Sequence, residues 1–159
     1  VNDKKYEPLF AKFVNDSSYS VAGSALDGLI TLNPANAYTL AKKYSSDAKG
    51  KLGAVVNKAV MANATEDDFN IVYDNYKASP PSQDKVQETI VFGKYLVGMK
   101  ENTHVKKGVN EIIKFRNQIP EKYRSFIDPG CKQVFGKISA AQRSAGNTEL
   151  ADYVEGLLK

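Results

Sequence analysis

Apolar residues recur along the chain every three to four positions, a spacing that places them on one face of a helix. The clearest stripes are Leu52, Val55, Val56, Ala59 and Val60; Phe69, Val72, Tyr73 and Tyr76; Val105, Val109, Ile112 and Ile113; and Leu150, Val154, Leu157 and Leu158. No segment alternates apolar and polar residues convincingly as a half-buried strand does. The pattern therefore predicts an all-α fold.

Polar caps and prolines stand where the stripes begin, as they do at the starts of helices. These signals are Asn33 before Pro34, Thr65 with Asp68 three residues later as a capping box, Ser82, and Asp128 before Pro129. They predict helices at about residues 6–14, 18–32, 34–44, 47–62, 66–78, 83–100, 103–118, 129–144 and 148–158, with a short turn at about 121–126.

Asparagines mark the short turns between predicted helices, at Asn33, Asn63, Asn102 and Asn147. Connections this short force neighbouring helices to pack antiparallel. The turns recur irregularly, at spacings within the range of helical repeats. We therefore expect residues 1–159 to form a single helical-repeat domain, in which antiparallel helix pairs stack as a HEAT-like superhelix, or α-α solenoid.

The composition, with 42% hydrophobic and 25% charged residues, is that of a globular domain. No uncharged apolar run of about 18 residues is present, so the sequence predicts a soluble protein without a membrane segment. The chain opens at Val1 without a methionine or an apolar signal core, which suggests a piece of a longer protein. Its compartment, cytoplasmic or periplasmic, stays open.

The formal charge of +4 is too small to imply nucleic acid by itself. Residues 100–124 hold 7 basic and 3 acidic side chains and carry the whole excess, because basic and acidic residues balance on either side of that segment. On a helical wheel Lys107 and Lys114 fall away from the apolar face and most simply form a solvated surface. The alternative is contact with an anion or substrate, for which the candidates are Lys106, Lys107, Lys114 and Arg124.

The sequence offers little for catalysis or metal binding. One histidine, His104, is expected to be solvated or locally hydrogen-bonded near a helix start, and one cysteine, Cys131, excludes an intramolecular disulfide. Cys131 follows a helix start, which can lower a thiol pKa, although free cysteines are more often small buried hydrophobes. A zinc site from His104, Cys131 and carboxylates is conceivable but poorly supported, since zinc needs three or four converging ligands. We predict no catalytic, cofactor or metal residues in this chain.

The phrase Asp16-Ser17-Ser18-Tyr19-Ser20-Val21, followed by Ala25-Leu26 and Leu29, resembles the C-terminal helical repeats of bacterial zinc aminopeptidases related to aminopeptidase N and leukotriene A4 hydrolase. In these repeats a D-x-S-Y-x-V phrase opens a helix and A-L-x-x-L continues it. Asp16 or Ser17 would cap the helix, and its buried face would consist of Tyr19, Ala22, Leu26, Leu29 and Ile30.

The resemblance is specific over about residues 15–44 and architectural beyond them. It implies a non-catalytic C-terminal domain that covers the active-site cavity of a metallopeptidase and limits peptide access. Its partners would be the catalytic domain of the same parent chain and the peptides that enter the shared cavity. The zinc and the catalytic residues of this hydrolase would belong to the parent protein.

Two other functions are compatible with the residues. A stand-alone helical-repeat scaffold that binds a protein partner explains everything except the phrase at residues 16–29. RNA binding through residues 100–124 is weaker, because no RNA-binding motif accompanies the charge. We therefore expect neither a nucleic acid nor a membrane as a partner.

Overall fold

A computed structural model describes residues 3–46 and 48–158, and these residues form helices and connecting turns without a strand. The all-α prediction is confirmed. Contacts divide the chain into two compact units, unit 1 (Val1–Ala64) and unit 2 (Thr65–Lys159), where the sequence predicted one helical-repeat domain. A continuous HEAT-like stack through both units stays a prediction.

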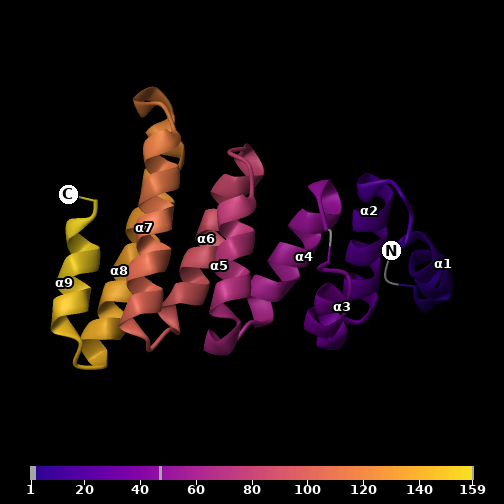
Figure 1. Cartoon of the computed structure of the whole chain (residues 1–159), viewed down its shortest axis with the longest axis horizontal. Helices are drawn as coiled ribbons and strands as arrows, with labels where there is room; N and C mark the ends of the chain where they lie inside the picture. The colour runs from indigo at the N-terminus through magenta and orange to yellow at the C-terminus, as the bar shows by residue number, and fades with distance from the viewer. Residues whose placement is uncertain (1–2, 47, 159) are drawn as a thin grey trace. The chain divides into compact units, whose positions relative to one another are not determined.

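The described residues of unit 1 form four α-helices around an apolar core. Its elements are η1 (Lys4–Tyr6), α1 (Glu7–Phe13), α2 (Tyr19–Leu32), η2 (Pro34–Asn36), α3 (Ala37–Lys43) and α4 (Gly50–Asn63). Helix α2 packs against α1, α3 and α4 (Figure 1). Gly23 lets α2 approach the start of α4, because a Cβ at this position would lie 2.6 Å from the backbone nitrogen of Leu52.

In unit 2, residues 65–158, which the structure describes, form five α-helices that alternate in direction (Figure 1). Its elements are η3 (Glu66–Asp68), α5 (Phe69–Ala78), α6 (Gln83–Val97), α7 (Asn102–Gln118), η4 (Glu121–Phe126), α8 (Asp128–Ser144) and α9 (Thr148–Gly156). Helices α5, α7 and α9 form one layer, and α6 and α8 form the other. Gly93 allows α6 and α8 to cross closely, since a Cβ there would overlap the side chain of Val134.

Most predicted helix starts agree with the structure. The carboxylate of Asp68 accepts a hydrogen bond of 3.0 Å from the backbone N–H of Thr65, as the predicted capping box requires. Ser82 caps α6 by accepting from the backbone N–H of Lys85 at 3.1 Å. Helix α4 begins at Gly50, and the predicted start at Asp47 lies outside the described residues. Within the described residues, no helix is long and apolar enough to cross a bilayer.

Some predicted side-chain roles are wrong. Neither Asp16 nor Ser17 caps α2, because its N-cap is Ser18 and no side-chain oxygen caps the helix. Tyr19 does not join the buried face of α2: its ring is 41% exposed, while Ala22, Ala25, Leu26 and Leu29 are buried. Asp128 does not cap α8 with its side chain, because its carboxylate binds Arg116 instead.

Candidate functional site

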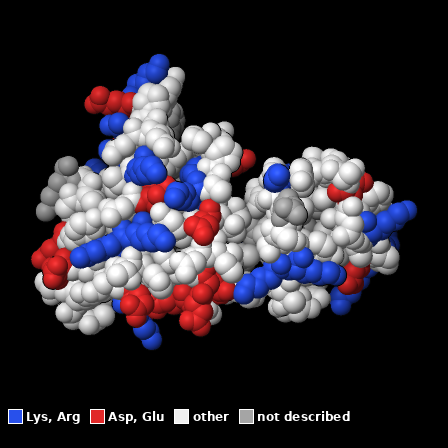
Figure 2. All heavy atoms as spheres, in the orientation of Figure 1, with Lys and Arg blue, Asp and Glu red and all other residues white. Residues whose placement is uncertain are grey.

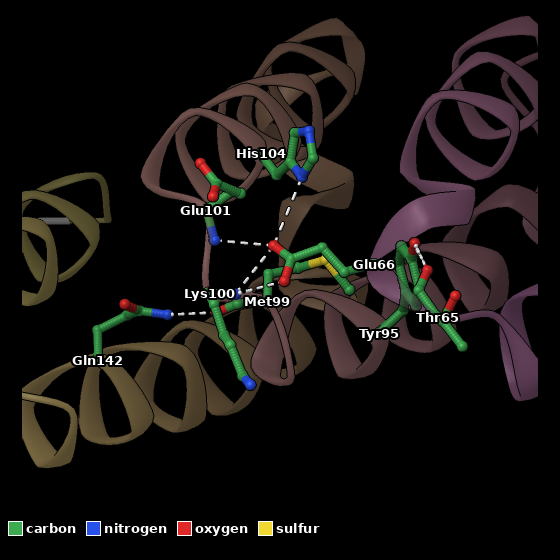
Figure 3. Close-up of polar contacts among 8 residues, drawn as sticks. All are labelled: Thr65, Glu66, Tyr95, Met99, Lys100, Glu101, His104 and Gln142. Atoms are coloured by element: carbon green, nitrogen blue, oxygen red, sulfur yellow. Dashed lines mark hydrogen bonds and ion pairs between the residues drawn. The ribbon is translucent and has the colours of Figure 1, made fainter.

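Polar contacts in unit 2 gather at the N-terminal end of α7, where η3, α6 and α8 also meet (Figure 3). The carboxylate of Glu66 accepts hydrogen bonds from the backbone N–H of Lys100 at 2.9 Å and of Glu101 at 2.7 Å. Both N–H groups lie just before the first residue of α7, where backbone donors and the helix dipole favour a negative charge. Glu66 therefore caps a helix that begins far from it in sequence.

The same hydrogen bonds change the acidity of Glu66. Burial favours the protonated carboxyl, but the N–H groups of Glu101 and Lys100, with a further contribution from His104, outweigh burial and lower the pKa of Glu66 below its ordinary value. The carboxylate is thus held in its charged form at the helix end.

His104 lies beside this carboxylate (Figure 3). Its Nδ1 is 3.5 Å from Oε1 of Glu66, and its ring stacks on Phe69 at a centroid distance of 4.1 Å. The side chain is 28% exposed, and its buried Nδ1 approaches Glu66 without a hydrogen bond of normal geometry, so neither the predicted solvation nor the predicted local hydrogen bond is found at this atom. His104 occupies the contact between η3, α5 and α7.

Further hydrogen bonds join the surrounding elements at this end of the unit. Tyr95 on α6 donates to the backbone carbonyl of Thr65 at 2.6 Å, and Gln142 on α8 donates to the carbonyl of Met99 at 2.9 Å (Figure 3). The predicted turn residues Asn102 and Asn147 are also bonded to each other through their side chains. These contacts connect residues that are 30 to 45 positions apart in the sequence. We call them, together with the contacts of Glu66, the junction, because they hold the surrounding elements to the start of α7.

The C-terminal end of α7 is held by two arginines. Arg116 makes a bidentate pair with Asp128, with N–O distances of 2.7 and 2.9 Å, and this hydrogen-bonded pair lowers the pKa of Asp128. Arg124 in η4 folds back, and its Nε donates to the carbonyl of Ile119 at 3.1 Å. The segment between α7 and α8 is therefore fixed from both sides.

Beside this segment lies a groove of about 590 Å³, which we call the tip groove. Its apolar lining includes Val86 of α6, Phe115 of α7, Ile119, and Tyr123 and Phe126 of η4. Phe126 is 78% exposed, and Tyr123 is 49% exposed. Sequence reasoning identified a turn here but not the groove, because the groove is assembled from residues about 30 to 45 positions apart.

The structure spreads the four predicted anion-contact residues along and beyond α7. Lys106 lies over Tyr153 of α9 at 5.5 Å, whereas Lys107 lies over Tyr73 of α5 at 4.2 Å. Lys114 is 3.9 Å from Glu111, and Arg124 binds backbone carbonyls at the far end. They do not converge on one anion, and on the visible face of unit 2 basic and acidic side chains interleave (Figure 2).

Cys131 is buried, with 1% of its surface exposed. Burial, reinforced by the charge of Asp128, raises the pKa of the thiol to about 11. The helix start therefore does not lower the thiol pKa, because loss of solvation outweighs the helix dipole. The favoured interpretation of Cys131, as a small buried hydrophobe, is confirmed.

Sequence reasoning missed Lys85, whose side chain is buried in unit 2. Its ammonium group donates to the carbonyl of Ser79 at 2.6 Å and lies over the rings of Tyr76 and Phe115 at 4.9 and 5.2 Å. Burial lowers its pKa. A signal was present, because Lys85 falls at helical spacing with the buried residues Thr89, Phe92 and Leu96.

His104 and Arg116 are separated by about 18 Å along the axis of α7, and Cys131 on α8 lies near Arg116, at the end of α7 that is far from His104. A mixed zinc site containing both is therefore incompatible with this geometry. Among residues 3–46 and 48–158, no group of three or more His, Cys, Asp or Glu side chains could hold a metal ion.

Comparison with known proteins found no matching family model, no matching curated protein and no matching solved structure.

Proposed function

We propose that this chain is the non-catalytic C-terminal domain of a zinc metallo-aminopeptidase, related to aminopeptidase N and leukotriene A4 hydrolase. The domain covers the cavity of the catalytic domain and limits which peptides enter. The zinc, its ligands and the catalytic glutamate belong to the parent protein.

The phrase at residues 16–29 carries this proposal. The carboxylate of Asp16 accepts a hydrogen bond of 2.8 Å from the backbone N–H of Ser18, immediately before α2. Ala25, Leu26 and Leu29 continue the phrase and are buried in the core of unit 1. The A-L-x-x-L part of the phrase thus packs α2, and its first part lies at the start of α2 with Tyr19 and Val21 exposed, which is consistent with a shared structural role of the buried part.

The first test is to read the complete amino-acid sequence encoded by the gene that contains this chain. We expect an upstream HExxH helix followed by a glutamate ligand, because this arrangement binds the catalytic zinc of such peptidases. A frame that starts with methionine near Val1 and encodes no HExxH would contradict the proposal.

The second test compares the parent enzyme with a version that lacks this chain. Removal should raise kcat/KM for a long peptide relative to a small aminoacyl amide, because a wider entrance admits larger substrates. Zinc content and amide cleavage report whether the truncated catalytic domain is folded. An unchanged substrate ratio in a zinc-loaded truncated enzyme would contradict the gating role.

The alternative is a stand-alone helical scaffold that binds a protein partner. The tip groove favours it, because its apolar lining and the exposed ring of Phe126 are features of protein interfaces. The two functions are distinguished by the reading frame, since only the peptidase requires an upstream zinc motif.

A further inference from the structure

Charge is unevenly distributed within residues 1–99, although their basic and acidic residues balance as a whole. Residues 28–64, which contain α3 and α4, hold five lysines and one acidic residue, whereas residues 65–99 hold three basic and six acidic residues. The five lysines are all exposed: Lys42, Lys43, Lys49, Lys51 and Lys58. Basic side chains gather over α3 on the visible side of unit 1 (Figure 2). We call the surface of α3 and α4 that carries these lysines the lysine face.

The packing of α3 against α4 brings the lysines to one part of unit 1. Lys42 and Lys43 end α3, and a short connection joins them to Lys49 and Lys51 at the start of α4. Lys58 lies on the same side of α4 as Lys51, because seven residues make about two turns of a helix. The positive charges are therefore concentrated on two adjoining helices.

Little negative charge offsets the lysine face. Within residues 3–46 and 48–158, no carboxylate forms an ion pair with Lys43, Lys49, Lys51 or Lys58. The first turn of α4 contains no acidic residue. Lys51 donates to the hydroxyl of Ser24 at 2.8 Å, which orients the ammonium group without neutralising it. A positive surface of this kind attracts a partner whose surface is negative.

The side chains between the lysines indicate the shape of that partner. Ala54 and Ala62 are exposed, and they share the outer face of α4 with Lys51 and Lys58 because all four follow helical spacing. Small side chains at a helix contact allow the two helix axes to come close together. Lysines beside such a contact can then pair with carboxylates of the second helix, as charged residues do beside the seam of a coiled coil.

Two other anionic partners fit the lysine face less well. The large apolar side chains that the structure describes as exposed in unit 1 lie on α1 and at the start of α2, so those of α3 and α4 offer none for insertion into a membrane. Unit 1 contains no arginine, and Lys42 and Lys43 lie over the half-buried rings of Tyr38 and Tyr44 at 4.7 and 5.2 Å. Rings covered in this way are poor platforms for stacking of nucleic-acid bases.

We propose that the lysine face binds an acidic helix of another protein, whose carboxylates pair with Lys51 and Lys58 across the small exposed side chains of α4. The proposal does not depend on the parent enzyme being a peptidase.

The test uses the whole chain and the fluorescently labelled helical peptide AEAAEAAAEAAEAAAEA, whose glutamates fall on one face. Binding is followed by fluorescence anisotropy at low ionic strength. We expect saturable binding that weakens as salt is raised, because salt screens exposed charges. The same peptide with glutamine in place of every glutamate should not bind measurably.

Charge-reversal variants locate the site. The double substitution Lys51→Glu with Lys58→Glu should weaken binding about tenfold, because two attractive pairs become repulsive. Lys132→Glu with Lys137→Glu on α8 is the matched control, because both lysines are exposed and the net charge of the chain changes equally. The control should change affinity less than about twofold. Circular dichroism should show both variants folded, since all four side chains are exposed.

A proline at the central position of the peptide tests whether the occupant is a helix. Proline breaks the helix and leaves the charge unchanged, so binding should weaken at least about threefold. Equal losses for the two double substitutions, or equal binding of the glutamate and glutamine peptides, would overturn the proposal. Undiminished binding of the proline peptide would also do so, as would tighter binding of an oligothymidylate of equal charge, because the occupant would then be an extended chain or a nucleic acid.

Discussion

The two units have different kinds of core. Unit 1 buries small and aliphatic side chains, including Ala22, Ala25 and Ala41, and relies on close backbone approach at Gly23. Unit 2 buries larger aromatic rings, and all five buried polar or charged side chains of the described residues belong to it: Asp68, Lys85, Thr89, Ser139 and Gln142. A core of the first kind is sensitive to added volume, whereas a core of the second kind is sensitive to lost hydrogen bonds.

The largest expected effect is in unit 1. Gly23→Ala would place a methyl group 2.6 Å from backbone atoms of Lys51 and Leu52, which cannot move aside as a side chain would. We expect the free energy of unfolding to fall by about 3 kcal/mol, measured by urea denaturation.

Gly136→Ala is the control for this substitution. Its Cβ would meet no atom within 4 Å, and alanine favours the helical conformation, so stability should rise by about 0.5 to 1 kcal/mol. If the two substitutions changed the free energy of unfolding equally, the close approach of α2 and α4 would not be what makes unit 1 sensitive to added volume.

The next effect is in unit 2. Gln142→Leu removes the donor to the carbonyl of Met99 and leaves that buried acceptor unsatisfied, which should cost about 2 kcal/mol. The buried thiol of Cys131 reports the opening of unit 2, and its labelling rate should rise about 30-fold.

The same substitution at the exposed Gln133 on α8 is the matched control, and it should leave the labelling rate nearly unchanged. An increase for Gln133→Leu as large as for Gln142→Leu would argue against a special role for the bond to Met99.

A smaller, pH-dependent effect is expected at Glu66. Because its pKa is lower in the folded chain than the ordinary value of 4.5, its stabilisation is present above pH 4.5 and is lost as the pH falls through the folded-state pKa. Glu66→Gln should reduce stability by about 1 kcal/mol at pH 7 and by less in acid.

Asp67→Asn is the control for Glu66→Gln, because Asp67 is exposed in the same short helix. Unfolding curves at pH 7 and pH 3.5 measure both variants. A loss for Glu66→Gln that is as large at pH 3.5 as at pH 7 would show that the charge does not stabilise α7.

The smallest effect is on the surface of unit 1. Ser24→Ala removes the exposed hydrogen bond of 2.8 Å from Lys51, for which water can substitute, so stability should change by less than about 0.5 kcal/mol. A loss above 1 kcal/mol in urea denaturation would show that unit 1 also depends on polar contacts.

Within unit 2, the sequence could predict the features whose signals are local. Helix positions followed from spacing and caps, as with Phe69, Val72 and Tyr76, all of which are buried, and with the capping box at Thr65. Such signals lie within a few residues of each other, so they can be recognised without knowledge of tertiary contacts.

The junction and the groove could not be predicted in this way. Glu66 binds N–H groups 34 and 35 residues away, and nothing near Glu66 in the sequence indicates that contact. The predicted cations Lys106 and Lys107 are adjacent in sequence, yet they lie over rings of different helices. Helical periodicity indicates which face of a helix is buried, but not which neighbour covers it.

The buried ammonium of Lys85 has a practical consequence. Amine-acylating reagents attack the uncharged, accessible form of lysine, and this side chain is enclosed by two aromatic rings and anchored to the end of α5. Acylation at this position should therefore lag behind that of exposed lysines, and mass spectrometry of the modified chain would record how often the start of α6 detaches from its neighbours.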